Sequence, residues 1–490
     1  MGVPSVEGQT GESPATATVL VTVDSLRADV VHSSIAEATP LTPSIDQLGN
    51  RGTEFDHAFA AGNWTPFSFP SLLGATPVFT DGPSLGVGSP PTLAETLAAE
   101  DVTTIGLNAA NGFLTEHWAY DRGFDRFESY LGDDRRLSSR YLRAHPTVQA
   151  WLRLAVAPFR RLNDRLRNRG TAHQHYPNAS HMRDLEADAI AAIETTEPPF
   201  FLWVHYMDTH TPYIPAPKHV RAVTGDTLGH TRMLRTHART GLGLEVDDRR
   251  LADLRTLYRA TVRQVDASIG RIMEALAAAG IRDETCVILT GDHGEEFQEH
   301  GHLAHYPKLY RELIHVPLIV DHPAETPPRI ERAVSLDSIP ATVCRAMGID
   351  PADRFARAGL FRSMHPAETG GRPAVSVTVR GDRVTRQPIP RELTDGELLV
   401  SARTDRWTYI EYTDTGRREL YDRLSDPNEQ VNRWPDAPAA PIERLQAAVD
   451  RRLAQIDSTP ESDASRDGPD TPETTPTDAI TDQLKALGYR

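Results

Sequence analysis

The sequence has few lysines. Of its 52 basic residues only three are lysine, whereas 68 residues are acidic, and the formal net charge is −16. So acidic a surface stays hydrated and repels phosphate backbones, which argues against nucleic-acid binding. A preference for arginine over lysine is expected both from adaptation to high salt and from a genome of high GC content.

Cysteines and long apolar runs are also scarce. The two cysteines, Cys286 and Cys344, exclude a disulfide framework, and their apolar surroundings predict that both are buried. No run approaches the roughly 18 apolar residues of a membrane span. The first residues also lack a basic stretch followed by an apolar one, so we expect no secretory signal and a cytoplasmic location.

Short apolar runs alternate with helical segments along the chain. The runs are TVLVTVD (18–24), TTIGL (103–107), FFLWVHYMD (200–208), TCVILTGDH (285–293) and VPLIV (316–320). Runs of this kind are typical of strands buried on both faces of a sheet. Their alternation with helices predicts an α/β fold with a large, mostly parallel sheet flanked by helices.

Composition divides the chain further. We predict a disordered lead (1–17), a catalytic domain (18–365) with an Arg-rich helical insertion (131–180), a smaller C-terminal α+β subdomain with antiparallel strands (366–455), a disordered acidic linker (456–480) and a short tail (481–490). Within 131–170, ten arginines and three aspartates alternate with apolar residues. This pattern predicts amphipathic helices that pack as a lid, or else rest peripherally on an anionic membrane.

Polar side chains follow several of these strands. Asp292 and His293 follow one run and Asp24 ends the first, and the carboxyl ends of such strands are where chemistry gathers. Asp24 could instead cap the following helix. Carboxylate and imidazole ligands suit Mn, Zn, Mg or Ca, so we expect one divalent metal ion at this edge.

Hydroxyl groups stand at a predicted helix start in NWTPFSFPSLLG (63–74), with Pro66 suited to the first turn. A helix N-terminus favours a bound anion and lowers the pKa of a hydroxyl. Thr65 and Ser68 are therefore candidate nucleophiles, although ordinary helix capping would also explain either residue.

The order of these elements resembles the sulfatase family of the alkaline-phosphatase superfamily. The matching motifs, in family order from about residue 19 to residue 432, are Asp24-Ser25, GFDRF (123–127), HYMDTHTPY (205–213), Asp292-His293-Gly294-Glu295 followed by Lys308 and VPLIV, SLDSIPATVCRAMGI (335–349) and ELYDRLSDPNEQVN (419–432). Each motif is modest alone, but chance does not explain all of them in order.

The sequence departs from this family at its nucleophile. Classical sulfatases oxidise a Cys or Ser to formylglycine, whereas the family's spacing back from Leu72-Leu73 puts Thr65 there, so no formylglycine is expected. Ser68, in Ser-x-Pro-Ser, is the rival register, but Leu72 replaces its Arg. The second Asp of the family is Ser25. The family's Gly-Lys-Trp-His element, which binds sulfate, is replaced here by GLNA (106–109).

The resemblance implies a site like that of Thr-dependent phosphodiesterases and glycerol-phosphate transferases. Asp24, Thr65, Asp292 and His293 would hold one metal ion. Thr65 would attack an anionic ester of a sugar or lipid head group, a phosphoester in preference to a sulfate ester. His210 would protonate the leaving group. The expected substrate contacts are Lys308, His205, His302, Arg27 and Asn108.

Several alternatives remain open at this point. Arg27 could merely pair with Asp29, Lys308 could be a surface residue of a PKLYREL helix, and His302 could cap a loop. The protein could instead hydrolyse sulfuric esters of glycans, bind glycan or lipid head groups without turnover, or hold two metals through Asp208 and His210. The choice between hydrolase and transferase, and the oligomeric state, stay open.

Overall fold

The structure is a computed structural model that describes residues 14–32, 40–74, 76–82, 85–88, 91–130, 181–226, 228–241, 246–324, 326–355, 359–361, 372–380, 393–436 and 438–457. The predicted insertion (131–180), most of the predicted lead, and the predicted linker and tail from residue 458 onward lie outside the described residues. Their predicted structures therefore remain predictions.

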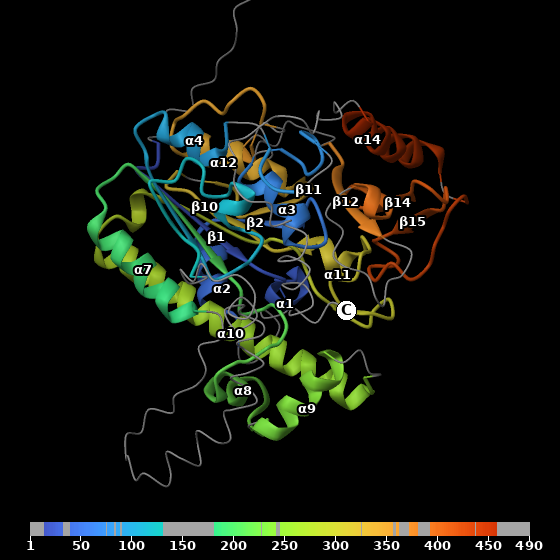
Figure 1. The fold of residues 1–490 in the computed structure, drawn as a ribbon, viewed down its shortest axis with the longest axis horizontal. Helices are drawn as coiled ribbons and strands as arrows, with labels where there is room; N and C mark the ends of the chain where they lie inside the picture. The colour runs from blue at the N-terminus through green and yellow to red at the C-terminus, as the bar shows by residue number, and fades with distance from the viewer. Residues whose placement is uncertain are drawn as a thin grey trace, which may run out of the picture.

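The central sheet places the first strand in its middle (Figure 1). Nine described strands form it, in the order β11-β2-β10-β6-β1-β5-β3-β4, with β9 paired to β2. β1 (Ala17–Val23) pairs in parallel with β5 (Phe200–Tyr206) and with β6 (Thr285–Gly291). The other strands are β2 (Thr53–Phe59), β3 (Thr103–Asn108), β4 (Arg126–Glu128), β9 (His315–Val316), β10 (Leu318–Asp321) and β11 (Arg329–Ser335). The predicted large, mostly parallel sheet is confirmed, and only β9 and β10 run antiparallel to their neighbours.

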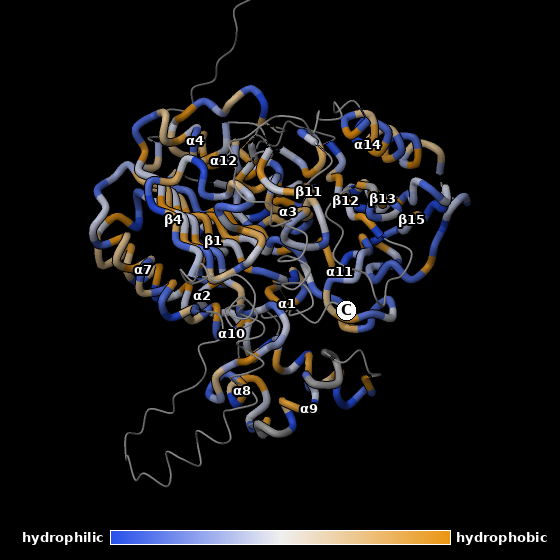
Figure 2. The backbone as a smooth tube through the Cα atoms, in the orientation of Figure 1, coloured by the Kyte–Doolittle hydropathy of each residue, from blue (hydrophilic) through white to orange (hydrophobic). Residues whose placement is uncertain are grey.

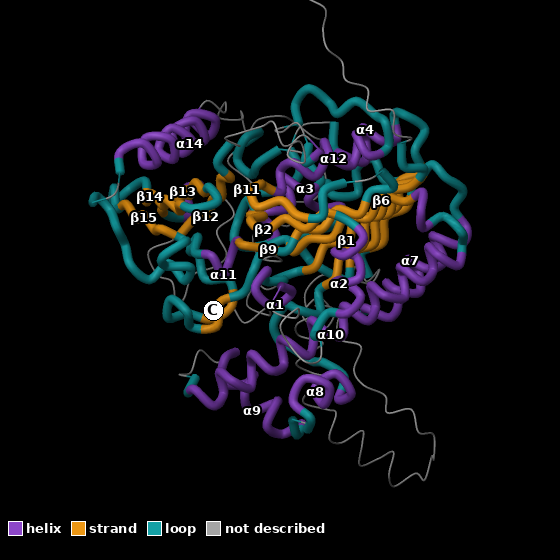
Figure 3. Tube along the Cα trace, turned by 180° about the vertical axis from the view of Figure 1, so that it is seen from behind, coloured by secondary structure: helices purple, strands orange, loops and turns teal. Residues whose placement is uncertain are grey.

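Helices cover both faces of this sheet (Figures 1 and 3). α2 (Pro43–Arg51), α7 (Met182–Thr195) and α10 (Asp248–Ala278) lie on one face, and α3 (Thr65–Leu72), α4 (Leu93–Ala98) and α12 (Ile339–Ala346) lie on the other. Alternate residues of β1 belong to the hydrophobic cores on the two faces of the sheet. Val19 and Val21 pack toward α10, whereas Leu20 packs toward α12. Figure 2 shows the hydrophobic residues concentrated along these central strands.

Shorter elements complete the described chain. The helices are α1 (Ala28–His32), α8 (Pro217–Thr224), α9 (His230–Gly241) and α11 (Arg311–Ile314), and the 3-10 turns are η2 (Glu116–Trp118), η3 (Arg282–Glu284), η4 (Leu336–Ser338) and η5 (Leu393–Asp395). β7 (Glu296–Phe297) and β8 (Leu303–Ala304) form a small hairpin directly after the predicted metal motif. Both cysteines are buried, as predicted. Among the described residues, no helix is both long and apolar enough to cross a bilayer.

A second, antiparallel sheet forms the C-terminal subdomain. Its order is β12 (Ala374–Arg380), β13 (Glu397–Arg403), β14 (Trp407–Tyr412) and β15 (Arg418–Asp422), and α14 (Ala439–Asp457) packs on it. β12 docks on the main domain because the N–H of Val377 donates to the carbonyl of Ala61 at 2.9 Å. This contact lies just before α3, so the subdomain borders the predicted nucleophile.

Candidate active site

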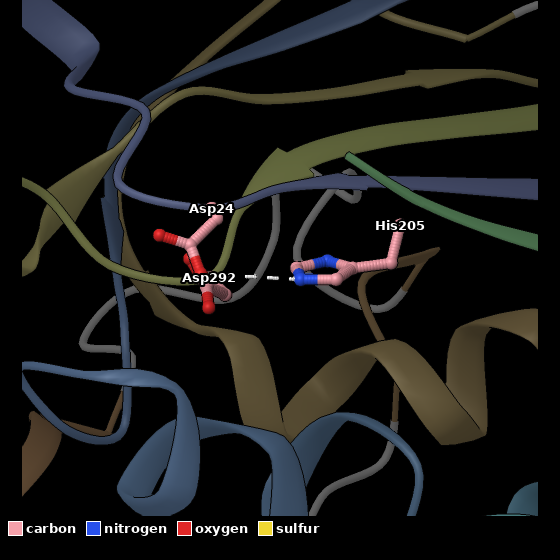
Figure 4. Close-up of side chains that lie close together, drawn as sticks. All are labelled: Asp24, His205 and Asp292. Carbon is pink, nitrogen blue, oxygen red and sulfur yellow. Dashed lines mark ion pairs between the residues drawn. The ribbon is translucent and has the colours of Figure 1, made fainter. Parts of the chain in front are cut away.

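The ends of β1 and β6 bring two aspartates together (Figure 4). Val23 pairs with Gly291 at the ends of the two strands, and the next residues are Asp24 and Asp292. The backbone N–H of Asp24 donates to Tyr206 at 2.8 Å, and that of Asp292 donates to Val23 at 3.2 Å. Both side chains are fully buried. The predicted convergence of strand ends therefore produces a buried carboxylate pair.

Thr65 lies between these carboxylates at the first residue of α3. Its Oγ1 is 3.1 Å from Oδ2 of Asp24 and 3.0 Å from Oδ2 of Asp292. The chain turns closely before α3, where a Cβ on Gly62 would lie only 2.3 Å from the Cβ of Phe67. The hydroxyl thus stands at a helix N-terminus and within hydrogen-bond reach of both acids.

Ser68, the rival candidate, has a different partner. Its hydroxyl donates to the backbone carbonyl of Asp292 at 2.7 Å, and its side chain is fully buried. A hydroxyl that is hydrogen-bonded to a buried carbonyl stabilises the fold at that point. Of these two hydroxyls, only that of Thr65 contacts the carboxylate oxygens of Asp24 and Asp292.

Two imidazoles face the carboxylate pair. Nδ1 of His293 donates to the carbonyl of Gly294 at 2.8 Å, which leaves a lone pair on Nε2. That Nε2 lies 3.9 Å from Oδ1 of Asp24 and 3.6 Å from Oδ2 of Asp292. Nε2 of His205 lies 4.0 Å from Oδ2 of Asp24. The sequence predicted His293 as a ligand and His205 as a substrate contact, and the structure brings both to the acids.

These side chains have the character of a cation site. Ligand atoms of Asp24, His205 and Asp292 all lie within 4.8 Å of one another. Burial, together with the neighbouring Asp24, raises the pKa of Asp292 well above its usual range. Burial lowers the pKa values of His205 and His293 to about 4, so both rings are neutral at pH 7. Adjacent buried carboxylates with neutral imidazoles fit a divalent ion, whose charge would offset theirs.

A third imidazole, His305, was not predicted. Its Nδ1 lies 2.8 Å from Oε2 of Glu295, whose other oxygen accepts the hydroxyl of Tyr213. Burial lowers the pKa of His305, but the Glu295 carboxylate outweighs burial and the pKa is raised. The ring lies 4.7 Å from that of His293 and 5.0 Å from that of His210, and its Nε2 has no hydrogen-bond partner among the described residues.

His210, the predicted proton donor, is poorly suited to donate a proton at neutral pH. Its Nδ1 lies 2.6 Å from the carbonyl of Thr211 and so carries the proton, which leaves a lone pair on Nε2 of the neutral ring. Burial also lowers the pKa of His210. At neutral pH this ring is better suited to accept a proton than to donate one.

The structure places another asparagine than the predicted Asn108 next to Thr65. The Asn108 amide donates to the carbonyls of Asn111 and Leu114, at 3.0 and 2.6 Å, and so holds the loop after β3. Asn111 reaches the site instead, with its Nδ2 3.3 Å from both Thr65 Oγ1 and Asp24 Oδ2. Only the course of this loop decides which asparagine faces the site.

Arg27 and Lys308, two of the predicted substrate contacts, bind other groups of the protein. Arg27 pairs with Asp29 at 2.7 Å and with Glu299 at 2.8 Å, which is the structural alternative for this residue. Lys308 precedes α11, and its ammonium donates to the carbonyl of His300 and to Nδ1 of His302. Among the described side chains, neither cation contacts the two aspartates or Thr65.

Comparisons with known proteins agree with this architecture. The family model described as Sulfatase matches residues 16–349. Arylsulfatase K of Bos taurus is 26% identical over 234 residues, which cover 44% of this chain and 39% of that protein. A sulfatase of Formosa agariphila is 29% identical over 176 residues, covering 36% and 31%. The chain thus spans no more than about two fifths of the length of these curated relatives.

Solved structures share the fold across nearly the whole chain. BT4656, solved with its substrate D-glucosamine-2-N,6-O-disulfate, has a TM-score of 0.66 at 16% identity and covers 92% of this chain and 100% of its own. The phosphonate monoester hydrolase of Agrobacterium radiobacter has a TM-score of 0.64 at 19% identity, with coverages of 91% and 96%. At these identities the likeness establishes the fold alone.

Proposed function

The chain belongs to the sulfatase family, and from that premise we propose that it is a metal-dependent hydrolase of phosphoric or sulfuric esters with Thr65 as its nucleophile. One observation carries the proposal. The Thr65 hydroxyl lies between two fully buried carboxylates, at 3.1 and 3.0 Å, beside two neutral imidazoles. A structural threonine at a helix start requires no such surroundings.

The proposed metal ligands are the predicted Asp24, Asp292 and His293, with His205 as a further nitrogen. A divalent ion bound there supplies Lewis acidity, which lowers the barrier to attack on an anionic ester. The surrounding residues hold these ligands in place. Ser25 donates its N–H to Oδ1 of Asp292 at 3.1 Å, and Thr22 contacts Nδ1 of His205 at 3.0 Å.

The chain's own groups account for the proton transfers. As Oγ1 of Thr65 bonds to phosphorus or sulfur, its proton passes to the adjacent carboxylate of Asp24 or Asp292, and Asn111 keeps the oxygen oriented. The bond to the leaving oxygen breaks, and Nε2 of His305 donates a proton to that oxygen. His210 then accepts a proton from the water that attacks phosphorus or sulfur, the bond to Oγ1 of Thr65 breaks, and the aspartate returns its proton to Oγ1.

A phosphoester is the favoured substrate because a threonine hydroxyl cannot form the geminal diol that classical sulfatases use. The curated relatives carry the name sulfatase, which keeps sulfuric esters of glycans as the second candidate. A head-group binding protein without turnover is the remaining alternative, and it predicts that no ester is hydrolysed and that loss of the Thr65 hydroxyl leaves ligand binding unchanged.

The test compares Thr65→Ala, Thr65→Ser and Ser68→Ala with the parent chain. The substrates are an aryl sulfate, an aryl phosphomonoester and an aryl phosphodiester, each with Mn, Mg, Ca or Zn. We expect Thr65→Ala to lose about a thousandfold or more in kcat, Thr65→Ser to keep part of it, and Ser68→Ala to stay within about tenfold. Circular dichroism and metal content check that the variants stay folded and loaded.

The outcomes separate the alternatives. Full activity of Thr65→Ala would eliminate the assigned nucleophile. Loss in Ser68→Ala with retention in Thr65→Ala would move the role to the rival register. Metal binding without turnover of any ester would favour the head-group binding protein.

A further inference from the structure

A group of cationic and aromatic side chains lies beside the candidate active site. We call it the cation cluster, and it consists of His302, Tyr306, Lys308 and Arg380. The Lys308 ammonium contacts Nδ1 of His302 at 2.9 Å and lies 5.3 Å from the centre of the Tyr306 ring. The ring of His302 stacks on Tyr306 with 3.6 Å between ring centres. These contacts hold His302, Tyr306 and Lys308 together.

Arg380 brings the C-terminal subdomain into the cluster. It is the last residue of β12, and its charge partly offsets the rise that burial causes in the pKa of Tyr306. Its charge, after the larger effect of burial, also lowers the pKa values of Lys308 and His302. The three groups that carry or can take positive charge therefore come from two separate parts of the fold.

Two acidic groups near the cluster, Glu296 and Glu312, are more buried than its cations and have other partners. Glu296 accepts the backbone N–H groups of His300 and His302, at 3.0 and 2.8 Å. Glu312 pairs with Nδ1 of His300 at 2.6 Å. Glu296 is fully buried and Glu312 is 7% exposed, whereas Lys308, His302 and Arg380 are partly exposed. A ligand that arrives from solvent would thus meet the cations first.

The cluster is adjacent to the nucleophile. Asn63, two residues before Thr65, donates its amide to the carbonyls of His305 and Tyr306, at 3.1 and 3.2 Å. His305 faces the histidines of the candidate active site, and the next residue, Tyr306, belongs to the cluster. His305 and Tyr306 are consecutive residues, so the cluster adjoins the candidate active site along the chain.

We propose that the cation cluster binds a second anionic group of the substrate, on the same sugar as the ester that is cleaved. The inference rests on the proposed function and names its substrate class, a sugar that carries two or more negative groups. Ammonium and guanidinium groups bind sulfate, phosphate or carboxylate. The Tyr306 ring supplies an apolar face for the sugar.

Binding of two sugars tests the proposal without requiring turnover. Calorimetry on the full, metal-loaded chain would compare glucosamine 6-O-sulfate with glucosamine 2-N,6-O-disulfate. We expect the disulfate to bind at least about tenfold more tightly, because a charge-assisted hydrogen bond contributes at least that factor. Lys308→Met and Arg380→Gln should each reduce this advantage severalfold and leave binding of the monosulfate unchanged.

Lys218→Met is the matched control, since Lys218 is an exposed lysine on α8 and should leave both affinities unchanged. A parent chain that binds the two sugars equally, or binds neither, overturns the inference. Variants that weaken both sugars to the same extent also overturn it, because the cations would then serve the reacting ester.

The binding measurements and the turnover measurements together separate this inference from the proposed function. Suppose that no ester is turned over but the disulfate preference depends on Lys308 and Arg380. The anion site then stands and the hydrolase proposal fails. Conversely, turnover that requires Thr65, with no disulfate preference, would leave the hydrolase and remove the anion site.

Discussion

The candidate active site and the cation cluster meet at His305 and Tyr306, yet they are built in different ways. The first stands at the ends of buried parallel strands, where Asp24 and Asp292 are fully buried. The second is partly exposed and joins a short hairpin to the last residue of β12. Rigid strands suit groups that must be placed accurately, and the periphery of a site suits groups that select among substrates.

This difference implies a division of labour that mutation can break. Changes at the strand ends should reduce turnover of every substrate. Changes at the cluster should alter only which substrate is preferred. The predictions below run from the largest expected effect on turnover to the smallest.

Asp292→Asn should have the largest effect. It removes one of two adjacent buried carboxylates, so metal affinity should fall and kcat should fall by about a thousandfold for all esters. Metal content after dialysis and kcat for each substrate would be measured. Asp266→Asn is the control, because that buried acid caps α2 through the N–H groups of Ser44 and Ile45 and should keep the metal.

The same variant should also stabilise the metal-free chain. Without a cation, Asp24 and Asp292 repel each other in a buried setting, and the amide removes that repulsion. Thermal unfolding in EDTA should therefore show a higher midpoint for Asp292→Asn than for the parent, and the order should reverse with metal added. A lower midpoint in both conditions would contradict the cation site.

Glu295→Gln should have an intermediate effect that depends on the leaving group. The carboxylate pairs with His305 at 2.8 Å and supports its protonated form. Its loss should slow esters with poor alkyl leaving groups by about a hundredfold, and nitrophenyl esters much less. Equal slowing of both classes would show that Glu295 only supports the fold.

Arg27→Met should have the smallest effect on turnover. Arg27 bridges Asp29, Glu299 and the carbonyl of Glu295, all within the protein. Loss of these contacts should lower the free energy of unfolding by about 1–3 kcal/mol and leave KM within about threefold. A large rise in KM with unchanged stability would restore the predicted substrate role.

The sequence predicted the strand ends well for a physical reason. The sequence of a strand buried on both faces is a continuous apolar run. A polar residue at its end, such as Asp24 or Asp292, is therefore easily recognised. β2 and β11 were not predicted because their residues alternate in burial and include charged side chains, as in TEFDHAF and RIERAVS. Pairing with neighbours, rather than local composition, makes them strands.

Side chains on loops were predicted less well. Asn108 and Asn111 have the same chemistry, and only the loop geometry decides that Asn111 reaches Thr65. The sequence did not indicate a role for His305, because its partner, Glu295, lies ten residues earlier across a hairpin. Arg380 lies in a different subdomain from Lys308. Composition and spacing carry no record of such long-range contacts.

The central position of β1 has a consequence for synthesis of the chain. β1 leaves the ribosome first among the described strands, but its parallel neighbours, β5 and β6, begin only at Phe200 and Thr285. A nascent chain must therefore keep this apolar segment from aggregating until β5 and β6 have been translated. Until Asp292 emerges, the buried carboxylate pair does not exist, and we expect partial translation products to be inert and to depend on chaperones.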